Sequence, residues 1–244
     1  MKVVAIAVLS LLCGTSCDKR EAAPPATAPV PPVPAATVTE SHETCTAGKM
    51  TLCPVDEAAQ DPALAAYRTK LLDAVARKDE ASLLPLLADD LRVSFGGGGG
   101  IADFQKHWKT SSPDSPLWAE LGAILEHGGS FIGEGTNPSF WAPYVYSKWP
   151  DDVDAFEHLA VMRAGAPLRN GADDAAAVVR TLDWAIVKVL EPASDSQAAW
   201  RHVRAADGTE GWVSTKDVRS PIGYRAGFNQ VNGQWKMTAL VAGD

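Results

Sequence analysis

The chain has 244 residues, of which 46% are hydrophobic, and it carries a formal net charge of -8 at pH 7 with a sequence pI near 5.1. This apolar content is sufficient for a folded core, so the chain is not disordered throughout. The acidic balance argues against a protein that binds nucleic acid or anionic lipid through a basic surface, because such surfaces need clustered Lys and Arg.

The segment from Met1 to Cys17 has the order of a secretory signal peptide, with Lys2 followed by an apolar run and then by small residues. The apolar run is shorter than the ~20 residues that a membrane-spanning helix needs. The small residues before Cys17 resemble a bacterial lipoprotein signal, which implies that Cys17 becomes a diacylated first residue. Simple secretion is the alternative. Asp18 matches the enterobacterial rule for inner-membrane retention, so we expect a periplasmic, lipid-anchored protein, with the inner membrane favoured over the outer.

A Pro/Ala-rich segment separates this signal from the first predicted helix. Residues 21–38 are almost all Ala, Pro, Thr and Val, a composition that favours polyproline II and cannot bury enough surface to fold. We therefore expect residues 18–58 to form a tether that holds the folded body away from the membrane.

Two of the four cysteines remain available for a disulfide, because Cys13 leaves with the signal and Cys17 would be acylated. In an oxidising compartment, Cys45 and Cys53 are expected to bond each other. A metal site with His42 is the competing interpretation, but these three residues lack a fourth ligand and the usual tight spacing. No metal or cofactor is predicted.

The fold class expected is α+β, beginning with a helical α+β region at residues 59–157. Asp61-Pro62 combines a capping residue with a proline at the first helical position, and apolar residues then recur with helical spacing. The further elements predicted are helices at 81–87, 101–108 and 117–125 and a short strand at Leu91–Phe95. Residues 130–150 show no clear period.

From residue 158 the pattern changes to short runs typical of strands, at 159–163, 178–182, 185–190, 200–204 and 211–214. Ala166–Arg169, Val187–Leu190, Trp200–Val203 and the Asp207-Gly208 turn before Gly211-Trp212-Val213 resemble the ordered landmarks of bacterial Src-homology-3-like (SH3-like) domains. The resemblance implies a small β-barrel over residues 158–220. Residues 191–199 are longer than this pattern requires and suggest a protruding loop.

A β-hairpin is predicted at the C-terminal end, residues 221–244, because Asn232-Gly233 supplies the two positions that need positive φ in a type I′ turn. We consider two arrangements equally. In the first, the hairpin returns to pair with residues 91–95, so that the barrel is inserted into the α+β region. In the second, the two units follow one another and the hairpin extends the barrel.

No catalytic residue is predicted. The cell-wall peptidases that often carry SH3-like domains need a cysteine nucleophile, and the body of this chain offers none besides the bonded pair. Ser130 with His127 or His158 and a nearby aspartate is the residual hydrolase arrangement, but no nucleophile-elbow pattern surrounds any serine. The glycine run at 96–100 lacks the Lys and Ser or Thr of a phosphate-binding loop.

Eight tryptophans lie in the predicted folded part, and three of them fall within the SH3-like segment. Relatives of that domain use an aromatic-lined groove for peptides, so the resemblance implies a ligand site at Trp184, Trp200, His202 and Trp212. The leading hypothesis is a non-enzymatic lipoprotein that binds a cell-wall peptide or an envelope protein. The alternatives are an envelope hydrolase with a non-cysteine nucleophile, and a structural assembly protein whose groove is filled by its own residues 130–150.

Overall fold

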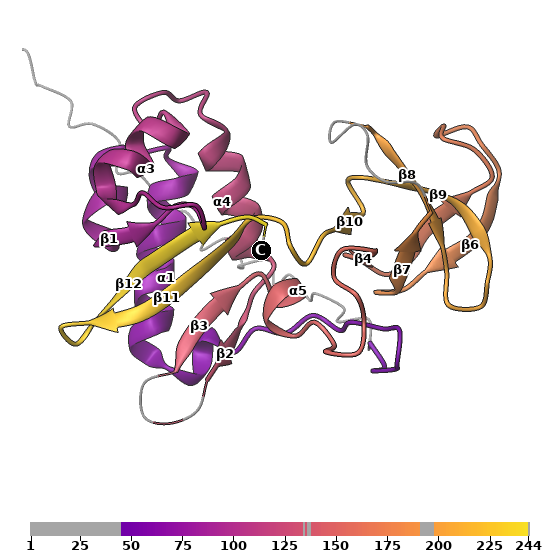
Figure 1. Cartoon of the computed structure of the whole chain (residues 1–244), viewed down its shortest axis with the longest axis horizontal. Coiled ribbons are helices and arrows are strands. Elements are labelled where there is room, and N and C mark those ends of the chain that lie inside the picture. Colours follow the sequence, from indigo (N-terminus) through magenta and orange to yellow (C-terminus); the bar gives the residue numbers. More distant parts are fainter. Residues whose placement is uncertain (1–44, 134, 136–137, 191–197, 244) are drawn as a thin grey trace, which may run out of the picture. The chain divides into compact units, whose positions relative to one another are not determined.

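A computed structural model describes residues 45–133, 135, 138–190 and 198–243. The predicted signal, Cys17 and most of the tether lie outside these described residues. The described chain is a mixed α+β structure with two β-sheets (Figure 1). Within it, no helix is both long and apolar enough to cross a membrane.

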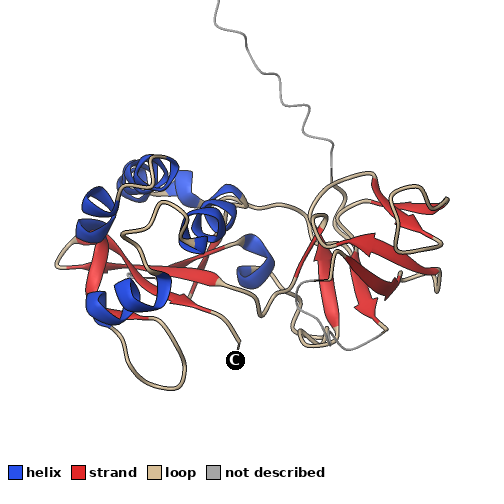
Figure 2. Cartoon of the chain, turned by 90° about the horizontal axis from the view of Figure 1, so that it is seen from above, coloured by secondary structure: helices blue, strands red, loops and turns tan. Residues whose placement is uncertain are grey.

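The first sheet has five strands in the order β1-β12-β11-β3-β2. Its strands are β1 (Leu87–Arg92), β2 (Ser130–Ile132), β3 (Ser139–Ala142), β11 (Arg225–Val231) and β12 (Gln234–Val241). The helices of the described chain are α1 (Pro62–Ala76), α2 (Glu80–Leu83), α3 (Gly100–Trp108), α4 (Pro116–Glu126) and α5 (Tyr144–Ser147), with short 3₁₀ turns at Ala58–Gln60 and Leu84–Leu86. The helices gather beside this sheet (Figure 2).

The C-terminal hairpin belongs to this first sheet. Its turn residues Asn232 and Gly233 have φ of 53° and 76°, as a type I′ turn requires. Strand β12 runs parallel to β1, with Leu87 opposite Met237. The chain therefore forms the second sheet between two parts of the first, as in the inserted arrangement, and the hairpin does not extend the second sheet.

The early strand begins before the expected residues 91–95, and the second helix is shorter than expected. Helix α2 ends at Leu83 and continues only as a 3₁₀ turn. Pro85 explains this difference because it has no N–H to donate to the carbonyl four residues earlier. The chain can therefore become extended at Leu87.

The first sheet and its helices enclose a large aromatic core. Asp61 caps α1 by accepting hydrogen bonds from the N–H groups of Ala63 and Leu64, at 2.8 and 3.1 Å. The helical spacing then turns one face of α1 inward. The core side chains include Tyr67, Phe104, Trp108, Trp118, Leu121, Phe140, Phe228 and Trp235, all of them buried.

Residues 130–150 form the short elements β2, β3 and α5, where no period was predicted. Strands of three and four residues are too short to show an alternation. Gly129 precedes β2 at a point where a Cβ atom would lie 2.3 Å from the carbonyl oxygen of Trp141. Only glycine permits this close pairing.

The second sheet has seven strands in the order β10-β4-β7-β8-β9-β5-β6, and every pair is antiparallel. The strands are β4 (His158–Val161), β5 (Ala166–Arg169), β6 (Val178–Leu182), β7 (Ile186–Val189), β8 (Trp200–Arg204), β9 (Glu210–Ser214) and β10 (Val218–Arg219). No pair between β10 and β6 closes the sheet in the described chain. The expected domain boundaries at 58, 157 and 220 stay predictions.

The segment after the tether is fixed by a disulfide and by backbone hydrogen bonds. Cys45 and Cys53 lie at bonding distance, with 5.6 Å between their Cα atoms. The N–H of Leu52 donates to Trp184 O at 2.8 Å, and the N–H of Glu57 donates to Gly129 O at 2.9 Å. This segment therefore contacts strands of both sheets.

Candidate binding surface

Three of the four predicted ligand residues lie on the neighbouring strands β8 and β9. Trp200 and His202 are two residues apart and share one face of β8, while Val203 points into the core on the other face. His202 lies directly opposite Trp212 on β9. All three predicted residues are partly exposed.

The rings of His202 and Trp212 are stacked, with 4.8 Å between their centroids and 16° between their planes. This geometry follows from the antiparallel register, which brings opposite side chains of one face within contact distance. Because neither ring is buried in the core, the pair presents a flat aromatic surface beside Trp200. We call Trp200, His202 and Trp212 the aromatic platform.

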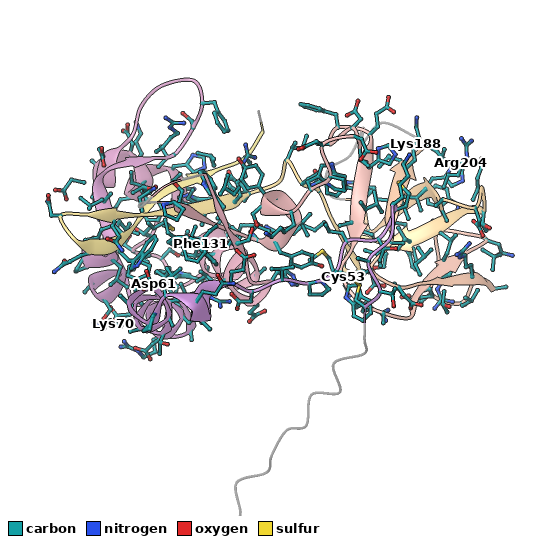
Figure 3. The ribbon with its side chains drawn as sticks, turned by 90° about the horizontal axis from the view of Figure 1, so that it is seen from below. Cys53, Asp61, Lys70, Phe131, Lys188 and Arg204 are labelled. Atoms are coloured by element: carbon teal, nitrogen blue, oxygen red, sulfur yellow. A yellow bond between two sulfur atoms is a disulfide. The ribbon has the colours of Figure 1, made fainter. Side chains whose placement is uncertain are left out.

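A row of four charged side chains, in which two cations stand between two carboxylates, borders the platform. Arg204 pairs with Glu210 at 2.6 Å, and Lys188 pairs with Glu157 at 2.8 Å. Lys188 and Arg204 are opposite each other in the β7-β8 register (Figure 3). These exposed pairs contribute little to stability, and they set a polar boundary on one side of the aromatic surface.

Arg169 is a site residue that the sequence analysis missed. It lies opposite Trp212 in the β5-β9 register. Its Nη1 donates to Ala176 O at 2.7 Å, whereas its Nε is buried without a hydrogen-bond partner among the described residues. The alternation of Ala166 and Leu168 into the core could have identified Arg169 as outward-facing.

Trp184 does not join the platform. It precedes β7 with a φ of 46° and lines a separate cavity of about 790 Å³, together with Arg180 and Ala205. Ala205 follows the last residue of β8, whereas Trp200 begins that strand. Since a strand rises about 3.3 Å per residue, Trp184 and Trp200 lie near opposite ends of β8.

The residual hydrolase arrangement is not assembled in the structure. Ser130 is buried on β2, and its hydroxyl donates to Ser147 O at 3.5 Å. The His158 ring nitrogen lies 2.9 Å from Asp154 O. Burial and the nearby Arg219 guanidinium lower the pKa of His127. Ser130 and His158 therefore bond to backbone carbonyls, and no hydrogen bond joins Ser130 to either histidine in the described part of the chain.

Two other candidate sites also have local explanations. The N–H of Gly99 in the glycine run donates to the Asp103 carboxylate at 2.8 Å, so an acidic side chain occupies the place of a phosphate. Among the described residues, no group of three or more His, Cys, Asp or Glu side chains could hold a metal ion.

The groove-filling segment expected for a structural protein also lies elsewhere. Residues 130–132 and 139–142 are strands of the first sheet, where they pair with each other and with β11. They therefore do not pair with the strands that carry the aromatic platform.

Comparisons with known proteins add little to this geometry. No family model matches the chain, and no curated protein matches it. Among solved structures, a protein from Shewanella frigidimarina NCIMB 400, named only provisionally as a ketosteroid isomerase, matches with a TM-score of 0.28 and 10% identity. The match covers 74% of this chain and 94% of that one. We draw neither fold nor activity from a likeness at this level.

Proposed function

We propose that this protein is a non-enzymatic lipoprotein of the periplasm, anchored through Cys17, whose second sheet is an SH3-like unit that binds a cell-wall peptide. The observation that carries the proposal is the partly exposed stack of His202 on Trp212. Aromatic side chains offer a large contact area with little conformational entropy to lose, which suits the recognition of peptides.

The sequence landmarks of the SH3-like domain support this proposal. Each landmark falls on a strand of the second sheet, namely β5, β7, β8 and β9. The most specific of them, Asp207-Gly208 before Gly211-Trp212-Val213, is the turn that joins β8 to β9, and Gly208 has a φ of 89°. The most specific landmark therefore lies at the two strands that carry the platform.

The chemistry of the platform favours a peptide with an apolar portion and a free carboxylate. The stacked rings would cover the apolar portion, and Arg169 beside Trp212 would supply donors to the carboxylate. A lipid anchor and tether would confine the protein to a layer near the membrane and raise its effective concentration towards the wall. Weak binding by the platform would then be enough.

The test is calorimetric titration of the chain from residue 18 onward with purified muropeptides. We expect saturable binding in the wild type and a loss of about tenfold or more in Trp212→Ala, because the variant removes half of the stack. Trp184→Phe is the matched control, since Trp184 lies in the connection between β6 and β7 and not on the platform, and the affinity of this variant should be unchanged. Equal affinities for wild type and Trp212→Ala would contradict the proposal. If no muropeptide binds, an envelope protein becomes the partner to test.

A further inference from the structure

The first sheet carries a buried arginine that no predicted site uses. Arg225 is the first residue of β11 and is only 4% exposed. Ala226 and Phe228 on the same strand point into the helical core, so Arg225 points to the opposite face of the sheet. Its Nη1 makes a long hydrogen bond of 3.5 Å to Gly223 O, and its Nε has no hydrogen-bond partner in the described chain.

The charge of Arg225 is not balanced by an acidic side chain of the described residues. Arg219 and Arg68, whose side chains are only 15% and 17% exposed, pair with Glu120 and Asp56 respectively. Arg225 instead lies over the ring of Tyr146, 4.5 Å from its centroid, and 5.2 Å from that of Phe95. Cation–π contacts offset part of the desolvation cost, but they leave most of the guanidinium donors without acceptors.

A cavity of about 540 Å³ opens beside this guanidinium. Arg225 lines it together with Tyr146, Trp149 and Phe156, and β2 contributes Ile132. The Phe156 side chain is 66% exposed and that of Ile132 is 38% exposed, which is unusual for large apolar residues. Asp151 also lines the cavity, but it is exposed and makes no ion pair with Arg225. The cavity thus combines one buried cation with a mainly apolar, solvent-accessible wall.

We propose that this cavity binds a small organic anion that joins a carboxylate to an apolar body. The guanidinium fork would donate two parallel hydrogen bonds to the carboxylate, a pair of donors that no other residue of the cavity supplies. Tyr146, Trp149 and Phe156 would cover the apolar body. The volume falls within the range of roughly 300–1,000 Å³ that small-molecule sites occupy. The site shares no residue with the aromatic platform and stands whether or not the platform binds a peptide.

The end of the chain offers a competing carboxylate. The N–H of Gly243 donates to Ile222 O at 2.9 Å, and Ile222 also lines the cavity. Asp244 follows Gly243 and lies outside the described residues. An Asp244→Asn variant separates an external ligand from this carboxylate of the chain itself.

The experiment is calorimetric titration of the chain from residue 18 onward with 4-phenylbutyrate and with its neutral amide. We expect saturable binding of the acid and an affinity about tenfold or more weaker for the amide, because the amide lacks the charge that the guanidinium selects. Arg225→Lys keeps the charge but loses the fork, and it should weaken binding of the acid about tenfold. Arg163→Lys, at an exposed pair with Asp217, is the matched control and should bind as the wild type does.

Phe156→Ala keeps the proposal testable if Arg225 variants do not fold, because Phe156 is mostly exposed and its loss should spare the fold. This variant should weaken binding of the acid by about threefold to tenfold. Equal affinity for the acid and the amide, or an unchanged Phe156→Ala, would overturn the proposal. Binding of the acid by the Asp244→Asn variant alone would overturn the proposal as well, since the carboxylate of Asp244 would then fill the site in the wild type.

Discussion

The first sheet and its helices bury three tryptophans, whereas the second sheet leaves its tryptophans partly exposed. In the first, Trp108, Trp118 and Trp235 are 4 to 6% exposed and belong to the core. In the second, the core consists of small aliphatic side chains such as Val203 and Val213, and its tryptophans remain partly exposed.

The width of each interior explains where the tryptophans lie. Helices on a sheet leave a wide interior that large aromatic rings can fill, and those rings then stabilise the fold. The interior of the second sheet is narrower, and valine, alanine and leucine already fill it. Its tryptophans therefore lie outside the core, where they are available for contact with a ligand.

The largest expected effect comes from breaking the aromatic core. Phe228→Ala should lower the free energy of unfolding by about 3–5 kcal/mol, because Phe228 packs between Tyr67 and Phe140 and its loss leaves a cavity. Val203→Ala in the second core should cost less, about 2 kcal/mol, since it removes only two methyl groups. Urea denaturation measures both values.

Hydrogen exchange followed by mass spectrometry provides the control for this pair. We expect Phe228→Ala to increase exchange in the helices and the first sheet, and Val203→Ala to increase exchange in the second sheet. Equal losses of stability, spread over the whole described chain, would show that the two cores do not differ as proposed.

Removal of the disulfide tests the segment that contacts both sheets. Replacing Cys45 and Cys53 together by Ser should lower the free energy of unfolding by about 2.5 kcal/mol on a chain-entropy estimate for a separation of eight residues. The change should also increase exchange at Leu52, whose N–H donates to Trp184 O. A thermal melt of the double variant against the oxidised, disulfide-bonded wild type provides the measurement, and identical melting curves would be the contrary result.

Asp61 fixes one tryptophan of the core and caps a helix at the same time. It accepts from the backbone of α1 and also from Trp235 Nε1, at 3.1 Å. Asp61→Ala should therefore lower the free energy of unfolding by about 1–2 kcal/mol. Asp61→Asn is the matched control because it still caps the helix, so a loss as large as that of Asp61→Ala would argue against the capping role.

The smallest effect concerns pH. Partial burial acts to raise the pKa of Glu57, but the hydrogen bond from the Phe131 N–H and the Lys148 ammonium outweigh it and hold that pKa below its usual 4.5. The unfolded chain therefore binds this proton at a higher pH than the folded chain does. The stabilisation is complete above the unfolded pKa and is lost as pH falls through the folded one.

Glu57→Gln should accordingly make the free energy of unfolding fall less steeply below pH 4.5 and leave its pH dependence above that value unchanged. Denaturation at a series of pH values checks this expectation. An unchanged pH dependence in the variant would show that Glu57 does not contribute to the loss of stability in acid.

The sequence predicted local elements better than it predicted which residues lie close together in the fold. The cap at Asp61, the Asn232-Gly233 turn and the strand β8 each depend on residues close together in the chain, so their patterns were legible. The spatial grouping of the tryptophans could not be predicted in this way, because Trp184 and Trp200 belong to the same segment yet lie near opposite ends of β8. Only the register of paired strands reveals that separation.

Arg225 illustrates a second reason why sites escape sequence reasoning. It stands at the start of a strand, where a charged residue ordinarily faces water. Its burial depends on Tyr146 and Phe95, which are contributed by elements distant in the chain. No local pattern around Arg225 indicates these contacts.

Trp200 and Trp212 of the second sheet are proposed to be contact residues, whereas Trp108, Trp118 and Trp235 belong to the core of the first sheet and its helices. The most direct measurement is a nitrogen-15 NMR titration of the eight tryptophan indole N–H signals with muropeptides. The account predicts shifts at Trp200 and Trp212, with the signals of Trp108, Trp118 and Trp235 unmoved. Shifts confined to the core tryptophans, or to Trp184, would contradict it.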